Sequence, residues 1–339
     1  MTDLLLRAAM ALSAAAGPTG RETAAVETAA QFLAPLVDTT WIDKLGNLIG
    51  LRRCGRPNAP RVVLDAHLDE VCLIVTGQEE NYLTFQPAFG SIDPRVLPGT
   101  VVELLADPPR RGVVTCLPPH ILSAEEQEKA FDLDRLRIDL GGETIPVGTP
   151  AVFTTEPVRL GEYQLCGKAL DDRSCFAVLL RTLELTDALP FDLYVLGSVQ
   201  EESTMAGAKA GLFSILPQAV LAVDVTFGTS PDTSAEDAFV LGEGPAIGVG
   251  PLLSKALTAQ LRACAVQCNL PHKVEIMERS LGTHAMAAGI TGEGIPAAMV
   301  SLPLRYMHTP CEVIDLRDAE NTAQLIAAWL RALRPEDLQ

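Results

Sequence analysis

From about residue 162 onward the chain alternates short apolar runs with stretches whose apolar residues recur at helical spacing, and this pattern constrains the fold most. Residues 191–199 are typical of a buried strand, whereas residues 171–189 and 316–333 are typical of amphipathic helices. Such alternation predicts an α/β fold: a three-layer sandwich with a mostly parallel central sheet covered by helices on both faces.

Residues 73–161 have a different character. Short β-prone runs such as YLTFQPAF, TVVELLA and RGVVTCL follow one another and are separated by Gly, Pro and Asp. Many short strands at close spacing are typical of a small barrel or sandwich. We therefore expect a small β-barrel domain at 73–161, inserted into a larger domain formed by residues 1–72 and 162–339.

Charge and hydropathy exclude several classes of partner. The formal net charge is −17 and the pI is near 4.7, so nucleic-acid phosphates and anionic lipids are unsuitable partners.

No apolar run approaches the roughly 20 residues of a membrane span. Asp3 precedes any basic residue and Arg7 interrupts the first apolar stretch, unlike a signal peptide. The eight cysteines form no CxxC pair and favour buried free thiols in a reducing compartment. We expect a soluble, cytoplasmic protein.

Polar residues mark the points where the predicted strands end. Ligands gather at the carboxyl ends of strands in open α/β sheets, so these side chains are expected to converge. The residues at or just after the strand ends are His67, Asp69, Glu201, Glu202, Asp224 and His308.

This mixture of side chains suits a pair of divalent metal ions. Zinc-like ions take imidazole and carboxylate ligands, and a two-metal site needs a bridging carboxylate. His67 and Asp69 lie two residues apart on an extended chain and so share a face, which suits Asp69 orienting a metal-bound imidazole. Glu201 and Glu202 are adjacent, so one can ligate while the other acts as a general base.

Each of these residues has a simpler structural explanation when it is taken alone. Asp171 and Asp172 begin a predicted helix and could cap it. The remaining residues could form a half-buried histidine at 67, a solvated turn at 201–202, an Asx-turn at Asp224 and a pairing of His308 with Glu312. All of these residues lie at strand or helix ends, and this joint occurrence favours a metal site.

Several motifs resemble, in order, those of a known family. The segments LDAHLDEVCLIV, GKALDDRSC, SVQEE, AVDVT and LPLRYMHTPCEVIDLRD are similar to the glutamyl aminopeptidase and tetrahedral aminopeptidase family, which includes members labelled endoglucanase. LSAAAGPTGRE and IDPRVLPGTVVEL extend the resemblance over nearly the whole chain. The resemblance implies a metal-dependent aminopeptidase that releases N-terminal residues from peptides through a water activated by two metal ions.

The resemblance also implies roles for individual residues. Asp171 would bridge two divalent ions, which could be zinc, cobalt or manganese, and the peptide bond between Asp171 and Asp172 would be cis. Glu201 would be the general base, and Asp69 would support His67. The remaining implied ligands are His67, Glu202, Asp224 and His308.

The resemblance also implies how copies of the chain would assemble. Residues 73–161 would form a dimerisation domain, with dimers assembling into a hollow tetrahedral dodecamer.

In two places the sequence departs from the family pattern. His284 replaces an acid within residues 282–285, close to the expected substrate pocket, and residues 203–207 read Ser-Thr-Met-Ala-Gly instead of Val-Gly-Leu-Arg-Gly.

Three further functions compete with this one. Another dinuclear-metal amidase, such as a deacylase or carboxypeptidase, would use similar ligands. A glycoside hydrolase would need two carboxyl groups and no metal, which leaves His67 and His308 without a role. A catalytically silent paralogue serving as a scaffold or binding module is the candidate from a different class.

Overall fold

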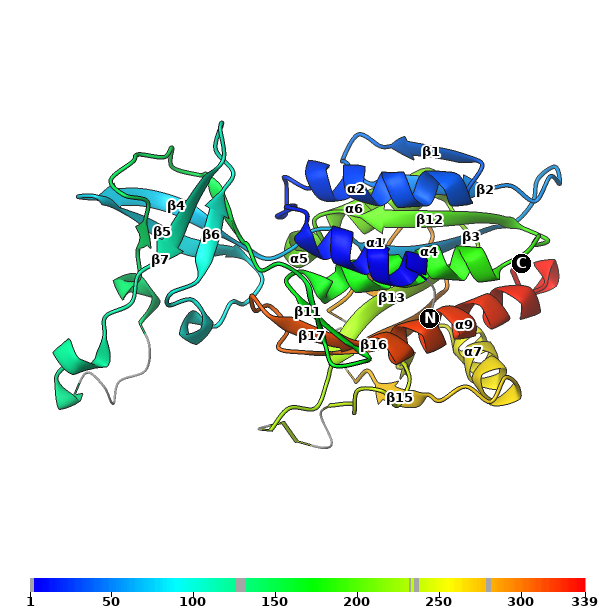
Figure 1. Cartoon of the computed structure of the whole chain (residues 1–339). Coiled ribbons are helices and arrows are strands. Elements are labelled where there is room, and N and C mark those ends of the chain that lie inside the picture. Colours follow the sequence, from blue (N-terminus) through cyan, green and yellow to red (C-terminus); the bar gives the residue numbers. More distant parts are fainter. Residues whose placement is uncertain (1–2, 126–131, 232, 235–237, 279–281, 339) are drawn as a thin grey trace.

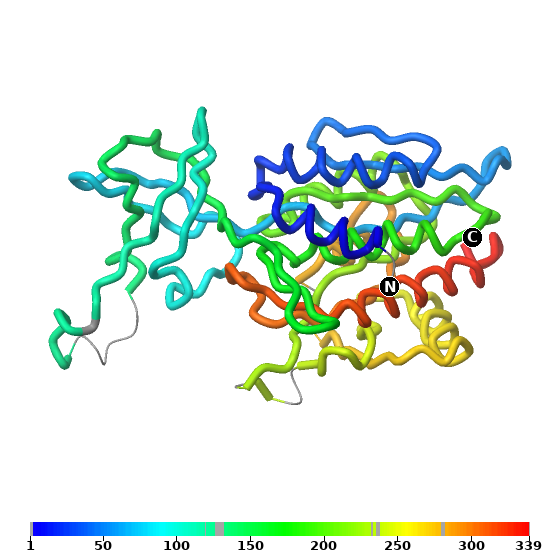
Figure 2. The backbone as a smooth tube through the Cα atoms, viewed as in Figure 1, coloured from blue at the N-terminus to red at the C-terminus, as the bar shows by residue number. Residues whose placement is uncertain are grey.

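The computed structural model describes residues 3–125, 132–231, 233–234, 238–278 and 282–338. Figures 1 and 2 show a large body in which helices cover a twisted sheet and, beside it, a smaller body built from strands. The smaller body comes from the middle of the chain, and the segments before and after it both belong to the large body.

The large sheet has the strand order β1-β2-β12-β3-β13-β16-β17-β11-β10, with β14 and β15 attached beside β16. The central strands β12, β3, β13 and β16 are parallel, whereas the strands at both edges pair antiparallel. The bounds are β1 Thr39–Ile42, β2 Leu48–Arg52, β3 Arg61–His67, β10 Val158–Leu160, β11 Gln164–Gly167, β12 Asp192–Ser198, β13 Ala219–Phe227, β14 Ala246–Val249, β15 Lys273–Ile276, β16 Ala297–Arg305 and β17 Glu312–Asp315.

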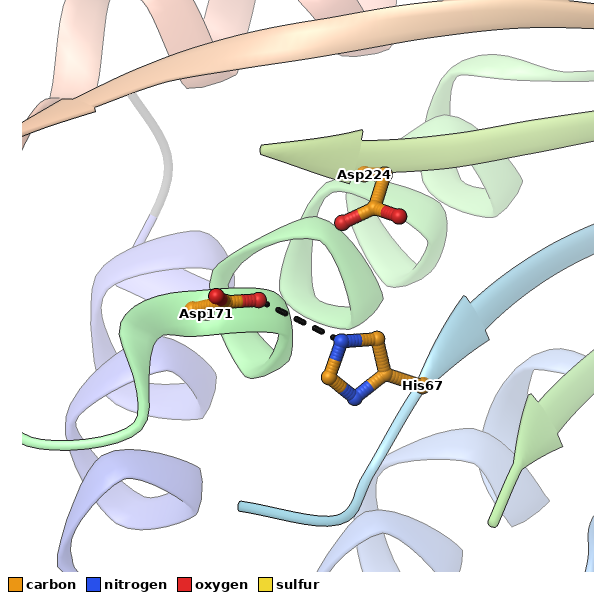
Figure 3. Close-up of side chains that lie close together, drawn as sticks. All are labelled: His67, Asp171 and Asp224. Carbon is orange, nitrogen blue, oxygen red and sulfur yellow. Dashed lines mark ion pairs between the residues drawn. The ribbon is translucent and has the colours of Figure 1, made fainter. Parts of the chain in front are cut away.

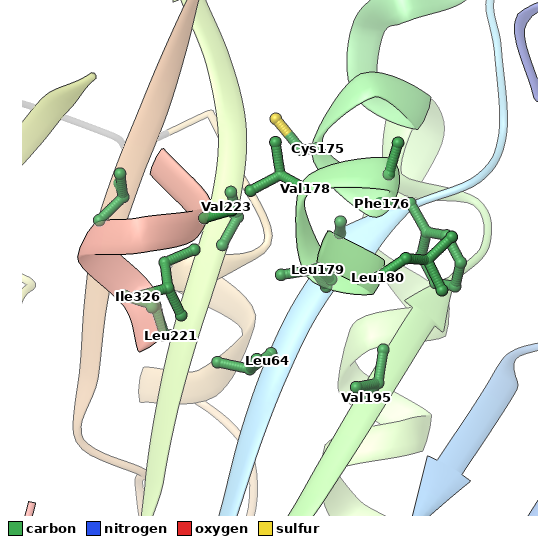
Figure 4. Packing of buried hydrophobic residues seen from close by; sticks show 14 of the residues in the cluster. Leu64, Cys175, Phe176, Val178, Leu179, Leu180, Val195, Leu221, Val223 and Ile326 are labelled. Atoms are coloured by element: carbon green, nitrogen blue, oxygen red, sulfur yellow. The ribbon is translucent and has the colours of Figure 1, made fainter. Parts of the chain in front are cut away.

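Helices cover both faces of this sheet. The bounds are α1 Asp3–Ala14, α2 Thr23–Leu33, α4 Leu170–Leu185, α5 Glu201–Thr204, α6 Ala206–Ile215, α7 Lys255–Gln267, α8 Ala285–Gly289 and α9 Leu316–Ala332. Side chains alternate along a strand, so Val62 and Leu64 of β3 belong to the core that includes α1, α4 and α9, whereas Val63 belongs to a separate core that includes α6 and α8. Figure 4 shows part of the first core, to which α4 contributes Leu179, α9 contributes Ile326 and β13 contributes Leu221. The predicted three-layer α/β fold is confirmed.

The smaller body is a closed β-barrel with the strand order β4-β5-β8-β7-β6-β9. Its strands are β4 Cys72–Glu79, β5 Tyr82–Phe89, β6 Val101–Leu104, β7 Arg110–Val114, β8 Ile138–Asp139 and β9 Pro150–Phe153. It has its own core, in which Leu73, Phe85 and Leu104 are buried, separate from the core of the sandwich. The predicted inserted barrel is confirmed, and its proposed role in dimerisation stays a prediction. Of the helices that the structure describes, none is long and apolar enough to cross a membrane.

A buried ionic network joins the first helix to the sheet beneath it. Arg173 on α4 is fully buried and donates to the carbonyl oxygens of Leu12, Ala15, Gly17 and Leu68. Its guanidinium and the ammonium group of Lys168 also bind the carboxylate of Glu70, at 3.0 and 2.7 Å. Because Glu70 lies just after β3, this network fixes the segment that follows the last residue of that strand.

Replacing Arg173 with Met should destabilise the fold by about 3–5 kcal/mol, because it removes one partner of a buried ion pair and leaves several carbonyl oxygens without a donor. Urea unfolding monitored by circular dichroism measures this. Arg7→Met is the matched control, because Arg7 forms an exposed pair with Asp3 and should change stability little. Equal effects of the two substitutions would contradict the proposed importance of the network.

Candidate metal centre

The parallel strands bring the polar residues of the sequence to one edge of the sheet. His67 ends β3, Asp224 lies near the end of the neighbouring β13, and Glu201 and Glu202 begin α5 just after β12. Asp171 lies at the start of α4, which packs against β3 and β13. Figure 3 shows His67, Asp171 and Asp224 pointing toward one another from their separate elements.

Two groups of potential ligands share Asp171. In the first group, His67, Asp171 and Asp224 offer atoms that all lie within 4.8 Å of one another, and His67 Nε2 is 3.2 Å from Asp171 Oδ1. In the second group, His308 Nε2 lies 3.4 Å from Asp171 Oδ2 and 3.2 Å from Glu202 Oε1. The two oxygens of Asp171 thus face different groups, which is the arrangement that a bridging carboxylate requires.

The electrostatics of this cluster suit cations. Burial raises the pKa of the Glu201 carboxyl to about 9, although His67 opposes the shift. Burial lowers the pKa of His308, but hydrogen bonds to Asp171 and Glu202 outweigh it and raise the value to about 11. The pKa of Asp171 is lowered, because its hydrogen bonds to the two imidazoles outweigh burial. Carboxylates this close repel one another unless positive charge lies between them, and the imidazole and carboxylate donors fit divalent ions.

Asp69 supports the centre, and it does more than the sequence indicated. Its Oδ1 lies 3.5 Å from His67 Nδ1, which is longer than a hydrogen bond. The same carboxylate accepts hydrogen bonds from the backbone N–H groups of Glu201 and Glu202 and from the Thr19 hydroxyl. Asp69 therefore holds the backbone that carries the glutamate pair as well as facing the imidazole of His67.

Asp172 anchors a distant strand, whereas the sequence had left open that it caps α4. Its Oδ2 accepts a hydrogen bond of 3.0 Å from the backbone N–H of His67, across 105 residues of sequence. The peptide bond between Asp171 and Asp172 is cis, as the family resemblance implied. The two adjacent carboxylates thus serve different partners, since Asp171 faces the ligand groups while Asp172 anchors the end of β3.

Glu312 is a supporting residue whose function the sequence did not reveal. This buried carboxylate accepts a hydrogen bond from the backbone N–H of His308 on Oε1, at 2.9 Å, and from that of Asp171 on Oε2, at 3.0 Å. The sequence suggested that His308 and Glu312 could pair, and they do, but through the backbone. The His308 imidazole therefore stays free to face Asp171 and Glu202.

The barrel domain also reaches the centre. The carbonyl oxygen of Ser91, in the segment after β5, lies 3.2 Å from His308 Nδ1. A carbonyl oxygen can only accept, so Nδ1 must carry the proton and donate it. This fixes the tautomer whose Nε2 lone pair points at the second ligand group when the imidazole is neutral. Gly90, in the same segment, lies close to Glu202, because a Cβ atom added at this glycine would be 3.1 Å from Glu202 Oε2.

His284 contacts the residues of the centre but does not line the cavity in front of them. It is fully buried, its Nε2 donates to the Asp65 carbonyl oxygen at 3.1 Å, and its Nδ1 faces Asp224 Oδ2 at 3.6 Å. The cavity in front of the ligand groups has a volume of about 300 Å³ and is lined by Thr283 but not by His284. The ligand atoms of His284 also lie within 4.8 Å of those of Glu201 and Asp224, so the histidine adjoins two carboxylates that line the cavity.

Comparison with known proteins identifies the family to which the chain belongs. The family model described as M42 glutamyl aminopeptidase matches residues 46–325. A lysyl aminopeptidase of Pyrococcus furiosus is 33% identical over 317 residues, which cover 90% of each chain.

Solved structures match over nearly the full length. The aminopeptidase APDkam598 of Desulfurococcus kamchatkensis is 31% identical with a TM-score of 0.90, covering 99% of this chain and 96% of that one. The TET1 peptidase of Pyrococcus horikoshii, described as able to assemble into a tetrahedron or a large octahedral shell, is 25% identical with a TM-score of 0.84, covering 97% of this chain and all of that one. The chain therefore belongs to the M42 glutamyl aminopeptidase family.

Proposed function

We propose that this protein is a dinuclear-metal aminopeptidase that releases N-terminal residues from peptides. The observation that carries the proposal is the position of Asp171, whose two oxygens face two separate groups of imidazole and carboxylate side chains at the base of a cavity. Membership of a peptidase family and the names of its relatives support the reaction class.

The proposed ligand sets follow the two groups. His67, Asp171 and Asp224 would hold one ion, and Asp171, Glu202 and His308 the other. The set suits zinc, cobalt or manganese. When bound, the ions would polarise the scissile carbonyl and bring the pKa of a water molecule toward neutrality.

Glu201 is the proposed general base. It lines the cavity, belongs to neither of these two ligand groups, and its Oε2 lies 4.0 Å from His67 Nε2. Its Oε1 is buried and has no hydrogen-bond partner among the described residues, so it is available to a water molecule or substrate. Glu201 would take the proton of the attacking water and pass it to the leaving amine.

A homo-oligomer is part of the proposal. The relative from Pyrococcus horikoshii is described as forming closed shells, and the barrel of this chain exposes apolar side chains at Tyr82, Val101 and Val113. We infer that the barrel mediates dimerisation and that dimers assemble further into a dodecamer. Because Ser91 of the barrel contacts His308, packing at the barrel could also influence the metal centre.

Chelation should separate the competing functions. EDTA should abolish hydrolysis of dipeptides that have a free α-amino group, and zinc, cobalt or manganese should restore it, because the proposed water activation needs the ions. N-acetylated dipeptides should not be cleaved under either condition. Activity that survives EDTA would contradict a metal mechanism, and cleavage of the acetylated dipeptides would favour a deacylase or carboxypeptidase.

The Glu201→Gln variant should lose about 10²–10⁴-fold in kcat, because glutamine cannot accept the proton. Its metal content, measured by mass spectrometry, should equal that of the wild type, because Glu201 is not a proposed ligand. Glu293→Gln, an exposed charge loss, is the control. If Glu201→Gln kept full activity, the general-base assignment would be wrong.

The His308→Ala variant should lower metal occupancy as well as rate, because it removes a proposed ligand. Glu312→Gln should weaken metal affinity by about 10–100-fold, as expected for a residue that orients ligands, since its amide group would face one of the two backbone N–H groups that the carboxylate now accepts. Metal titration with circular dichroism as a folding check measures both. Unchanged occupancy in His308→Ala would remove this residue from the ligand set.

A further inference from the structure

The cavity in front of the ligand groups contains one more carboxylate, that of Glu275 on β15. Two hydroxyl groups hold it in place. Thr226 Oγ1 on β13 donates to Oε1 at 2.5 Å, and Ser301 Oγ on β16 donates to Oε2 at 2.6 Å. Donors from two neighbouring strands thus fix the carboxylate in position.

Glu275 has no cationic partner among the residues that the structure describes. In the proposed dinuclear state, two divalent ions balance the four carboxylates of Asp171, Glu201, Glu202 and Asp224. Among the residues that the structure describes, no cationic side chain contributes to the pKa of Glu275, which burial raises. A buried anion without a cation is unfavourable, so a positively charged ligand at this point would be stabilised.

The same cavity also has apolar and adaptable walls. Met277, Met299 and Met307 line the cavity together with Phe227. Met277 lies two residues beyond Glu275 along the chain and packs against the cluster that contains Met299. Flexible thioether side chains adapt to a long methylene chain, which keeps its apolar stem in contact while its charged end reaches a polar partner.

We propose that this cavity binds the side chain of a basic N-terminal residue, lysine or arginine, with its methylene stem on the methionines and its cationic end on Glu275. This inference rests on the proposed aminopeptidase function and names its substrate class. An acidic side chain would meet the Glu275 carboxylate and be rejected, whereas a neutral aliphatic side chain would gain the apolar contacts alone.

A different role for Glu275 would be to hold the free α-amino group. That role is common to every substrate, so its loss would affect all N-terminal residues alike. The side-chain role predicts instead that the loss depends on the charge of the first residue. Comparing lysine with norleucine, which has an aliphatic chain but no ammonium group, separates the two roles.

The test measures kcat/KM of the metal-loaded protein for lysyl, norleucyl and glutamyl p-nitroanilides. The wild type should prefer lysyl over norleucyl, and Glu275→Gln should lower the lysyl to norleucyl ratio about 10–100-fold, the usual effect of losing a hydrogen bond to a charged group. Glu243→Gln is the matched control, because Glu243 pairs with Lys273 at the exposed end of the same strand region, and it should leave the ratio unchanged.

Binding of the free amino acids gives a second readout that does not need turnover. Calorimetric titration should show lysine binding more tightly than norleucine to the wild type, with the difference lost in Glu275→Gln. A wild type that prefers norleucine, or a Glu275→Gln variant with an unchanged ratio in both assays, would overturn the inference. Absence of hydrolysis for every substrate would reject the proposed aminopeptidase function, while the titrations would still decide whether Glu275 recognises a basic side chain.

Discussion

The close approach of buried carboxylates around Asp171 is the constraint on which the rest of the structure depends. Such a cluster is unfavourable in an apolar interior, so its members have to be fixed by hydrogen bonds that keep them apart and correctly aimed. Asp69, Asp172 and Glu312 provide this, each by accepting backbone N–H groups of segments that carry candidate ligands. Three acidic residues that do not line the cavity thus hold the backbone of the residues that do.

The scaffold around the cluster extends this support outward. Arg173, which directly follows the two residues joined by the cis peptide bond, draws Glu70 and the segment after α1 against the end of β3. From the other side, the barrel supplies the Ser91 carbonyl oxygen to His308. The inserted domain and the sandwich have separate cores, yet they meet at the proposed centre, so changes at the barrel can be transmitted to a candidate ligand.

The pocket that would receive the substrate is built on the same strands as the ligand groups. Asp224 and Thr226 lie two residues apart on β13 and share a face, and so the strand that offers a candidate ligand also anchors Glu275. Metal binding and recognition of the substrate side chain would therefore both depend on β13. His284, at which the sequence departs from the family pattern, faces Asp224 of this strand and does not line the cavity.

The sequence by itself determined the fold class, the inserted barrel and the edge of the sheet at which His67, Glu202 and Asp224 meet. It could do so because strand and helix periodicities are local, and because parallel strands carry their final residues to one edge. The tertiary structure alone decided which oxygen of Asp171 faces which group, that Glu312 and Ser91 hold His308, and that Glu275 lies in the cavity. These contacts join segments separated by up to 217 residues, and no local pattern encodes which of them pack together.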